Sequence, residues 1–242
     1  MKQWTMLALA LVTGAAQADE AAVRAAVQRL LPNAVIESVQ PAAMADVFEV
    51  VANGEVLYVG ADGQHLLQGR LYDAQRRADL TASTENGLRR AALAKVGEEK
   101  RIRFAAAEEK HRITIFTDVD CGYCRKLHKE MSAINAAGIT VDYLMFPRAG
   151  QPSASYDKAG YVWCAVDRQD ALTASMSAGE LPADQRKACA HPITETMQLG
   201  QKLARLGTPT IIASDGSVLG GYLDPVQLAQ RLTAIPAAAA RP

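Results

Sequence analysis

The pattern of apolar and polar positions divides the chain into a short helical start, a region of strands and a longer mixed region. Residues 19–31 alternate charged residues with alanine and leucine at helical spacing and stop at Pro32, which predicts a short helix. Residues 34–72 carry short β-branched and aromatic runs separated by Asn53-Gly54 and Asp62-Gly63, so we predict an antiparallel meander of about four strands. A sheet of roughly 60 residues has a thin core and would gain from pairing with a second copy of itself.

A mostly polar helix is predicted over about residues 80–100. Its few apolar positions keep helical spacing while charged residues fill most of the others, which is typical of a spacer exposed to solvent between two folded units. We therefore assign residues 19–79 to an N-terminal domain, 80–100 to a linker helix and 101–242 to a second domain.

The second domain opens with a strand–helix–strand pattern. Residues 112–117 predict a buried strand, 125–137 a helix closed by Gly138, and 139–146 the next strand. Cys121 and Cys124 lie between the first strand and the helix. In such a βαβ unit a CxxC motif at the helix start indicates redox chemistry.

The remaining sequence predicts an insertion and a closing hairpin and helix. Residues from about 151 to 200 are helical and irregular in pattern, like an insertion. Residues 210–213 and 217–219 read as a hairpin turned at Asp215-Gly216. A final helix is predicted to reach about Thr233, with Asp224 as N-cap and Pro225 as its first residue.

The first eighteen residues resemble an export signal. Lys2 precedes a short apolar run, and Ala16-Gln17-Ala18 gives the small-x-small pattern of signal cleavage, so the mature chain is expected to begin at Asp19 in the periplasm. The alternative, a membrane anchor, is disfavoured because the run is about half of the roughly 20 apolar residues that a span requires. Lysines plus arginines equal aspartates plus glutamates, 26 each, so nucleic acid is not an expected partner.

The four cysteines, all in the second half, suggest one reactive pair and one structural pair. An exported chain meets an oxidising compartment, where an even cysteine count usually means disulfides. A helix N-terminus stabilises a thiolate, so Cys121, with an exposed sulfur at the cap, is the expected attacking thiol, and Cys124, one turn inward, the resolving thiol. Gly122 and Tyr123 between them carry no charge and leave the approach open.

Two plainer interpretations of the CxxC pair remain. All four cysteines could bind zinc, although Cys164 and Cys189 lie 25 positions apart and a structural site normally brings its second pair at close spacing. A bridge between Cys121 and Cys124 could also be merely structural, but so small a loop stabilises little. For Cys164 and Cys189 we favour a structural disulfide, worth roughly 3 kcal/mol in the chain-entropy model.

The other polar residues near the motif receive no firm role from the sequence. His128, two turns along the helix, is expected at the surface. Asp118 and Asp120 either tune the site or solvate its loop, and these alternatives stay open. Gly207-Thr208-Pro209-Thr210 by itself indicates an ordinary turn before a strand.

Several segments together resemble the DsbC family of bacterial periplasmic disulfide isomerases, specifically over about residues 112–233 and more weakly before that. The matching segments, in order, are Phe116-Thr117-Asp118, Cys121-Gly122-Tyr123-Cys124-Arg125-Lys126-Leu127-His128, Gly138-Ile139-Thr140-Val141, Tyr143-Leu144, Phe146-Pro147-Arg148, Trp163-Cys164-Ala165 and Gly207-Thr208-Pro209. The resemblance implies an α+β, cystatin-like N-terminal dimerisation domain, a linker helix, and an α/β thioredoxin-like domain with a helical insertion.

The resemblance also implies roles for particular residues. Pro209 would be a cis-proline facing the active-site sulfurs, with Thr208 before it, on an edge that binds extended substrate. Cys164–Cys189 would match the structural disulfide of the family. The related DsbG proteins carry proline after the first cysteine, so Gly122 favours the DsbC type. Thioredoxins place a buried carboxylate six residues before that cysteine, where this chain has Ile115, which leaves open how Cys124 is activated.

The expected activity is therefore isomerisation or reduction of wrong disulfides in exported proteins, by a homodimer with chaperone-like substrate binding. The dithiol is the only redox group expected, with no metal or other cofactor, and the membrane reductant DsbD would keep it reduced. The alternatives are a DsbG-like thiol reductase and a dimeric holdase in which the CxxC pair matters little.

Overall fold

The computed structural model describes residues 12–203 and 207–235, which fall into two compact units. The first unit reaches Glu85 and the second begins at Asn86, so the boundary lies within one helix. Among the described residues, no helix combines the length and the apolar character that crossing a bilayer requires.

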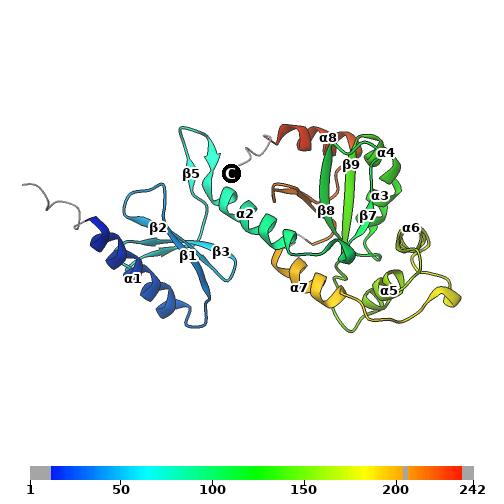
Figure 1. The fold of residues 1–242 in the computed structure, drawn as a ribbon, viewed down its shortest axis with the longest axis horizontal. Coiled ribbons are helices and arrows are strands. Elements are labelled where there is room, and N and C mark those ends of the chain that lie inside the picture. Colours follow the sequence, from blue (N-terminus) through cyan, green and yellow to red (C-terminus); the bar gives the residue numbers. More distant parts are fainter. Residues whose placement is uncertain (1–11, 204–206, 236–242) are drawn as a thin grey trace, which may run out of the picture. The chain divides into compact units, whose positions relative to one another are not determined.

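The first unit is a helix packed on an antiparallel sheet (Figure 1). The helix is α1 (Val12–Leu30), and the sheet has the order β1 (Ile36–Pro41), β2 (Val47–Ala52), β3 (Glu55–Gly60) and β4 (Leu66–Leu67). Val23 and Val27, one helical turn apart, are fully buried against Val50 and Val59 of the sheet. The predicted four-stranded meander is confirmed.

The turn between β2 and β3 shows why the meander could be predicted. Asn53 and Gly54 both adopt positive φ angles, 53° and 76°, the geometry that a two-residue hairpin requires and that these residue types tolerate. The helix prediction was less accurate, because α1 begins at Val12 rather than Asp19. Residues 12–18 include three alanines, which have the highest helix propensity, and the helix runs through the expected cleavage point after Ala18. Residues 1–11 of the expected leader lie outside the described residues, and the leader stays a prediction.

The segment between the two sheets also differs from the prediction. A small hairpin of β5 (Tyr72–Asp73) and β6 (Ala78–Asp79) was not predicted. The expected helix over residues 80–100 is shorter: α2 (Leu80–Ala94) ends at a turn that begins with Lys95, and the 3-10 helix η1 (Glu98–Lys100) follows Gly97. Its second half is not a solvated spacer, since Leu93 is buried against Phe116 of the second unit.

The second unit is built on a five-stranded mixed sheet (Figure 1). Its strands, in spatial order, are β11 (Val218–Gly220), β10 (Thr210–Ala213), β8 (His111–Thr117), β9 (Ile139–Met145) and β7 (Ile102–Phe104). β8 and β9 are parallel, and every other neighbouring pair is antiparallel. β7 was not predicted.

Helices cover both faces of this sheet. They are α3 (Gly122–Lys129), α4 (Met131–Ala136), α5 (Ala154–Trp163), α6 (Arg168–Ala178), the 3-10 helix η2 (Ala183–Gln185), α7 (Ile193–Leu203) and α8 (Pro225–Ala234). The continuous helix expected over residues 125–137 is wrong, because Glu130 leaves helical geometry and divides it into α3 and α4. α8 starts as expected, where the Asp224 carboxylate accepts hydrogen bonds from the next helical amides.

The central strand β8 is buried on both faces, which fixes where it ends. Ile113 and Ile115 face the main core beneath α3, while Phe116 faces the core formed with α2 and α7. The strand therefore holds its carboxyl end, and the CxxC segment that follows it, in a rigid frame.

Candidate active site

Cys121 is the N-cap residue of α3. β8 ends at Thr117, and the loop folds back so that the Cys121 amide donates to the Asp118 carbonyl oxygen at 3.0 Å. Cys121 has extended geometry, and its sulfur accepts a hydrogen bond from the Cys124 amide at 3.3 Å. A sulfur in this position satisfies one of the free amides of the helix and lies at the positive end of the helix dipole.

The Cys121 sulfur is covered, contrary to the exposed position expected from the sequence. Cys121 is only 3% exposed, because the loop with the cis peptide Thr208–Pro209 lies over it. The Cys121 thiol donates to the Thr208 carbonyl oxygen at 3.2 Å. The structure thus brings Thr208 and Pro209 to the cysteine pair across 87 residues of sequence.

The surroundings of Cys121 favour its thiolate. The pKa of Cys121 is lowered to about 5, first by the hydrogen bond from the Cys124 thiol, and further by the Thr208 side chain and the Cys124 amide. The partial burial of the sulfur opposes this shift, and the positive charge of Arg148 assists it. A thiol with this pKa is largely ionised at neutral pH and is nucleophilic.

Cys124 has the opposite character. It is 1% exposed on the inner face of α3, and burial raises the pKa of its thiol, as does the hydrogen bond with Cys121. Cys121 is therefore the thiolate and Cys124 keeps its proton, which it donates to the Cys121 sulfur. This is the division of roles expected of an attacking and a resolving thiol.

Gly122 and Tyr123, between the two cysteines, leave open space on the outer side of the motif. The space beside Gly122 is empty, and Tyr123 is 65% exposed. The Tyr123 ring lies 6.1 Å from that of Tyr222, and the Lys126 ammonium lies 4.3 Å from the Tyr222 ring centre. Tyr222 could not be singled out from the sequence, because it reaches the site from the distant loop before α8.

The two aspartates beside the motif have different environments. Asp118 is 3% exposed and accepts hydrogen bonds from the backbone amide and the guanidinium of Arg148, at 3.0 and 3.2 Å. Asp120 is partly exposed and pairs with Lys158 at 2.8 Å and Arg125 at 3.4 Å. Asp118 is thus a structural part of the site, holding Arg148 near the sulfurs, whereas Asp120 belongs to its charged rim.

His128 was expected at the surface and is buried instead. Its imidazole is hydrogen-bonded to the Tyr143 hydroxyl at 3.2 Å and the Thr173 hydroxyl at 3.0 Å, with only 5% of the residue exposed. Burial lowers the pKa of His128 to about 4, so the ring is neutral. The helical insertion covers this face of α3, which the local sequence could not show.

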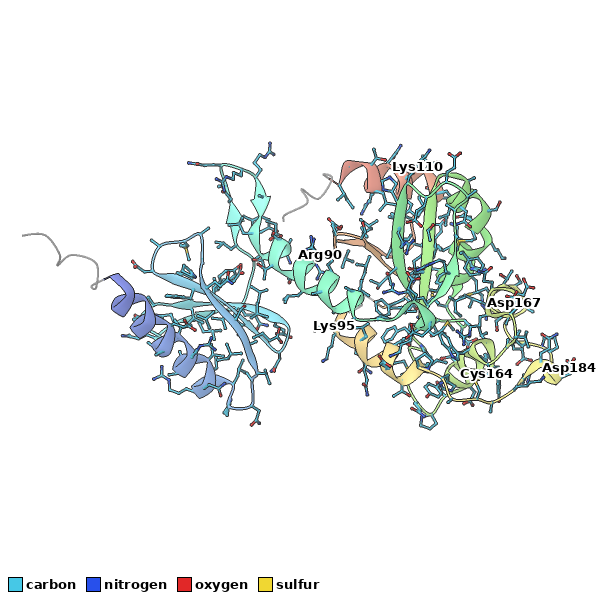
Figure 2. The ribbon with its side chains drawn as sticks, viewed as in Figure 1. Arg90, Lys95, Lys110, Cys164, Asp167 and Asp184 are labelled. Atoms are coloured by element: carbon cyan, nitrogen blue, oxygen red, sulfur yellow. A yellow bond between two sulfur atoms is a disulfide. The ribbon has the colours of Figure 1, made fainter. Side chains whose placement is uncertain are left out.

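The other two cysteines are joined within the insertion. Cys164 follows α5, as Figure 2 shows, and is bonded to Cys189 with a Cα–Cα distance of 5.6 Å. In this state neither sulfur is free to complete a zinc site with Cys121 and Cys124. Over residues 12–203 and 207–235, no group of three or more His, Cys, Asp or Glu side chains is arranged to hold a metal ion.

A thioredoxin-like sheet, a cysteine pair at a helix N-terminus and a facing cis-proline loop together define a thiol–disulfide oxidoreductase. Comparison with known proteins agrees with this class. Residues 14–82 match the family described as disulfide bond isomerase protein N-terminal domain, and residues 98–236 match the family described as thioredoxin-like domain. The chain belongs to the DsbC family of thiol:disulfide interchange proteins.

Relatives match along nearly the whole chain. It is 38% identical over 233 residues to the thiol:disulfide interchange protein DsbC of Dickeya dadantii, covering 96% of this chain and 93% of the relative. It is 37% identical over 237 residues to the DsbC protein of Escherichia coli K12, covering 96% of each. Among solved structures, a disulfide interchange protein from Neisseria gonorrhoeae is 30% identical with a TM-score of 0.51, covering 57% of this chain and 96% of that chain.

Proposed function

We propose that this protein reshuffles wrong disulfides in exported proteins, with Cys121 as the attacking thiol and Cys124 as the resolving thiol. The observation that carries the proposal is the position of the Cys121 sulfur, which caps α3, receives a hydrogen bond from Cys124 and has its pKa lowered to about 5. Thr208 and Pro209 support the reaction by flanking that sulfur, and Gly122 and Tyr123 leave room for a polypeptide on the outer side of the motif.

The first step is attack on a substrate disulfide. The Cys121 thiolate forms a bond to one substrate sulfur, the substrate S–S bond breaks, and the other substrate sulfur leaves as a thiolate. Enzyme and substrate are then joined in a mixed disulfide. Once Cys121 is bonded to the substrate it no longer donates to the Thr208 carbonyl oxygen, which can then accept a hydrogen bond from an amide of an extended substrate segment.

The mixed disulfide has two outcomes. In isomerisation, a free substrate thiolate attacks the substrate sulfur that is bonded to Cys121, a new substrate S–S bond forms, and Cys121 leaves as a thiolate, with no net transfer of electrons. In reduction, Cys124 attacks the Cys121 sulfur, so an enzyme disulfide forms and the substrate departs as a dithiol that has gained two electrons. The oxidised enzyme then needs an external reductant, for which we propose the membrane protein DsbD.

The setting of this activity belongs to the same proposal. The chain is exported, its leader is cleaved after Ala18, and it works in the periplasm as a homodimer joined through residues 19–79. The N-terminal unit supports this, because apolar Leu30, at the end of α1, and Val35, just before β1, are 62% and 66% exposed. The dithiol is the only redox group required. A DsbG-like reductase is less favoured, since Gly122 replaces the proline of that type.

The proposal is tested by trapping the intermediate. The Cys124→Ser variant, mixed with a scrambled multi-disulfide protein, should accumulate a mixed disulfide through Cys121, and the Cys121→Ser variant should form none. The unaltered protein should restore the native pairing of the scrambled protein at a catalytic ratio. If no adduct forms while aggregation of the substrate is still suppressed, the protein is a holdase and the proposed role of Cys121 is wrong.

A further inference from the structure

The resolving step poses a problem that the cysteine pair does not solve alone. Cys124 must lose its proton to attack Cys121, yet it is 1% exposed and burial raises its pKa. Ile115, which lies on the face of β8 beneath α3, is fully buried and offers no polar group. A buried thiolate without a hydrogen-bond donor would be costly to form.

Thr117 has a hydroxyl suited to this need. It follows Ile115 by two residues on β8, so both side chains point to the same face of the sheet, and Thr117 stands nearer the strand end that leads to Cys121. The residue is fully buried. Its backbone is committed to the sheet, where the Phe146 amide donates to the Thr117 carbonyl oxygen at 2.7 Å.

The Thr117 hydroxyl is one of few buried groups without a partner. In the described part of the chain five buried side-chain atoms complete no hydrogen bond, and Thr117 Oγ1 and Thr208 Oγ1 are the two whose side chains lower the pKa of a cysteine of the pair. Buried polar groups are nearly always paired, so an unpaired hydroxyl at a reacting sulfur calls for a functional explanation. Each sulfur has one such threonine, with Thr208 at Cys121 and Thr117 at Cys124.

We infer that the Thr117 hydroxyl, together with the Asp118 amide, donates hydrogen bonds to the Cys124 sulfur as it ionises during resolution. The inference rests on the proposed function and adds a residue to it. The Asp118 amide and the Thr117 hydroxyl both lower the pKa of Cys124, against the larger opposing effects of burial and of Cys121. A hydroxyl proton can rotate toward the sulfur when charge develops there.

The step balances without any further reagent. Cys124 forms an S–S bond with Cys121, the bond from Cys121 to the substrate sulfur breaks, and the proton of Cys124 passes to the departing substrate thiolate. Two electrons move from the enzyme dithiol to the substrate, while Thr117 keeps its own proton throughout. Thr117 is a positioning residue in this scheme: it stabilises the attacking sulfur and exchanges nothing.

The experiment compares Thr117→Val with Thr117→Ser in the full chain. Valine keeps the shape and removes the hydroxyl, whereas serine keeps the hydroxyl. Reduced protein is mixed, in a stopped-flow instrument, with an aromatic disulfide that releases a coloured thiolate. The first release, on attack by Cys121, depends on reagent concentration, and the second, on attack by Cys124, does not, so the two steps are measured separately.

We expect Thr117→Val to slow the second release about ten-fold, the effect of losing one hydrogen bond to a charged group, and to shift its pH profile upward by about one unit. The first release should be unchanged, the serine variant should resemble the unaltered protein, and the valine variant should melt no lower, since no completed hydrogen bond is removed. An unchanged second release in Thr117→Val, or equal slowing of both releases, would overturn the inference. Failure of the proposed function is distinguishable, because the unaltered protein would then show no rapid first release.

Discussion

Replacing Cys124 by alanine removes the hydrogen bond that contributes most to the low pKa of Cys121. A hydrogen bond to a charged group is worth about 1.5–3 kcal/mol, and about 1.4 kcal/mol corresponds to one pKa unit, so the loss should raise the pKa by about 1–2 units. From the value of about 5, the pKa of Cys121 should rise to between about 6 and 7. At pH 6 the thiolate fraction would fall from about nine-tenths to between about a half and a tenth.

The matched control is Cys124→Ser, which keeps a hydroxyl donor three residues after Cys121. Both variants carry one free thiol among the described residues, since Cys164 and Cys189 are bonded. Alkylation rates with iodoacetamide between pH 4 and 9 give the pKa of Cys121 in each. The serine variant should stay closer to the unaltered protein than the alanine variant. Equal pKa values in all three proteins would refute the assignment and leave the helix N-terminus and Thr208 as the causes.

The same pKa has a consequence for stability. Because the folded pKa of Cys121 lies below the ordinary thiol value of about 8.5, the thiolate stabilises the folded, reduced protein fully above that pH. This stabilisation is lost as the pH falls from about 8.5 to about 5. At pH 7, which lies about two pH units above the folded pKa, about 3 kcal/mol of it remains. The oxidised protein should lack this dependence, so urea unfolding of both forms at pH 5 and pH 8 isolates it.

Three further changes test other parts of the fold. His128→Gln should reduce the loss of stability on acidification. The folded pKa of His128, about 4, lies below the ordinary value of about 6.5, so only the unfolded chain binds a proton at this ring between those pH values. The free energy of unfolding of the unaltered protein should therefore fall by up to about 3 kcal/mol as the pH falls from about 6.5 to about 4. Urea unfolding at both ends of that range measures the difference, and equal slopes in the two proteins would contradict it. The double change Cys164→Ala and Cys189→Ala should cost roughly 3 kcal/mol and leave the alkylation rate of Cys121 unchanged. Arg101→Met should cost about 3 kcal/mol in denaturant unfolding, because it removes an ion-pair partner of buried Asp142 and leaves the Leu93 and Val96 carbonyl oxygens without the guanidinium; a loss below about 1 kcal/mol would show that the ion pair with Arg103 alone compensates Asp142.

The local features of the site could be predicted from the sequence because each rests on neighbouring residues. The apolar run of β8, the cysteine pair after it and the N-cap at Asp224 all follow from spacing and residue type. The break at Glu130 did not follow, because nothing near Glu130 is unfavourable in a helix. β7 was missed because three residues carry too little pattern to distinguish a strand.

The environment of each side chain could not be predicted, because distant segments create it. Cys121 is covered by the loop at Thr208, and His128 is enclosed by Tyr143 and Thr173. Thr117 is a common strand residue in the sequence. It becomes a candidate for function only when burial and the missing hydrogen-bond partner are both seen.

The shared hydrogen bond between the two sulfurs also orders the two steps of the reaction. In the reduced protein, the negative charge on Cys121 and the hydrogen bond it accepts both raise the pKa of Cys124, so the inner thiol keeps its proton while the outer one attacks. Once Cys121 is bonded to a substrate sulfur it carries no charge, and both of those effects disappear. Burial then opposes ionisation of Cys124, and the Asp118 amide and the Thr117 hydroxyl act against it. In the proposed reaction the inner thiol therefore becomes more acidic only after the mixed disulfide has formed, and its remaining burial slows the resolving attack, which leaves the substrate time to rearrange.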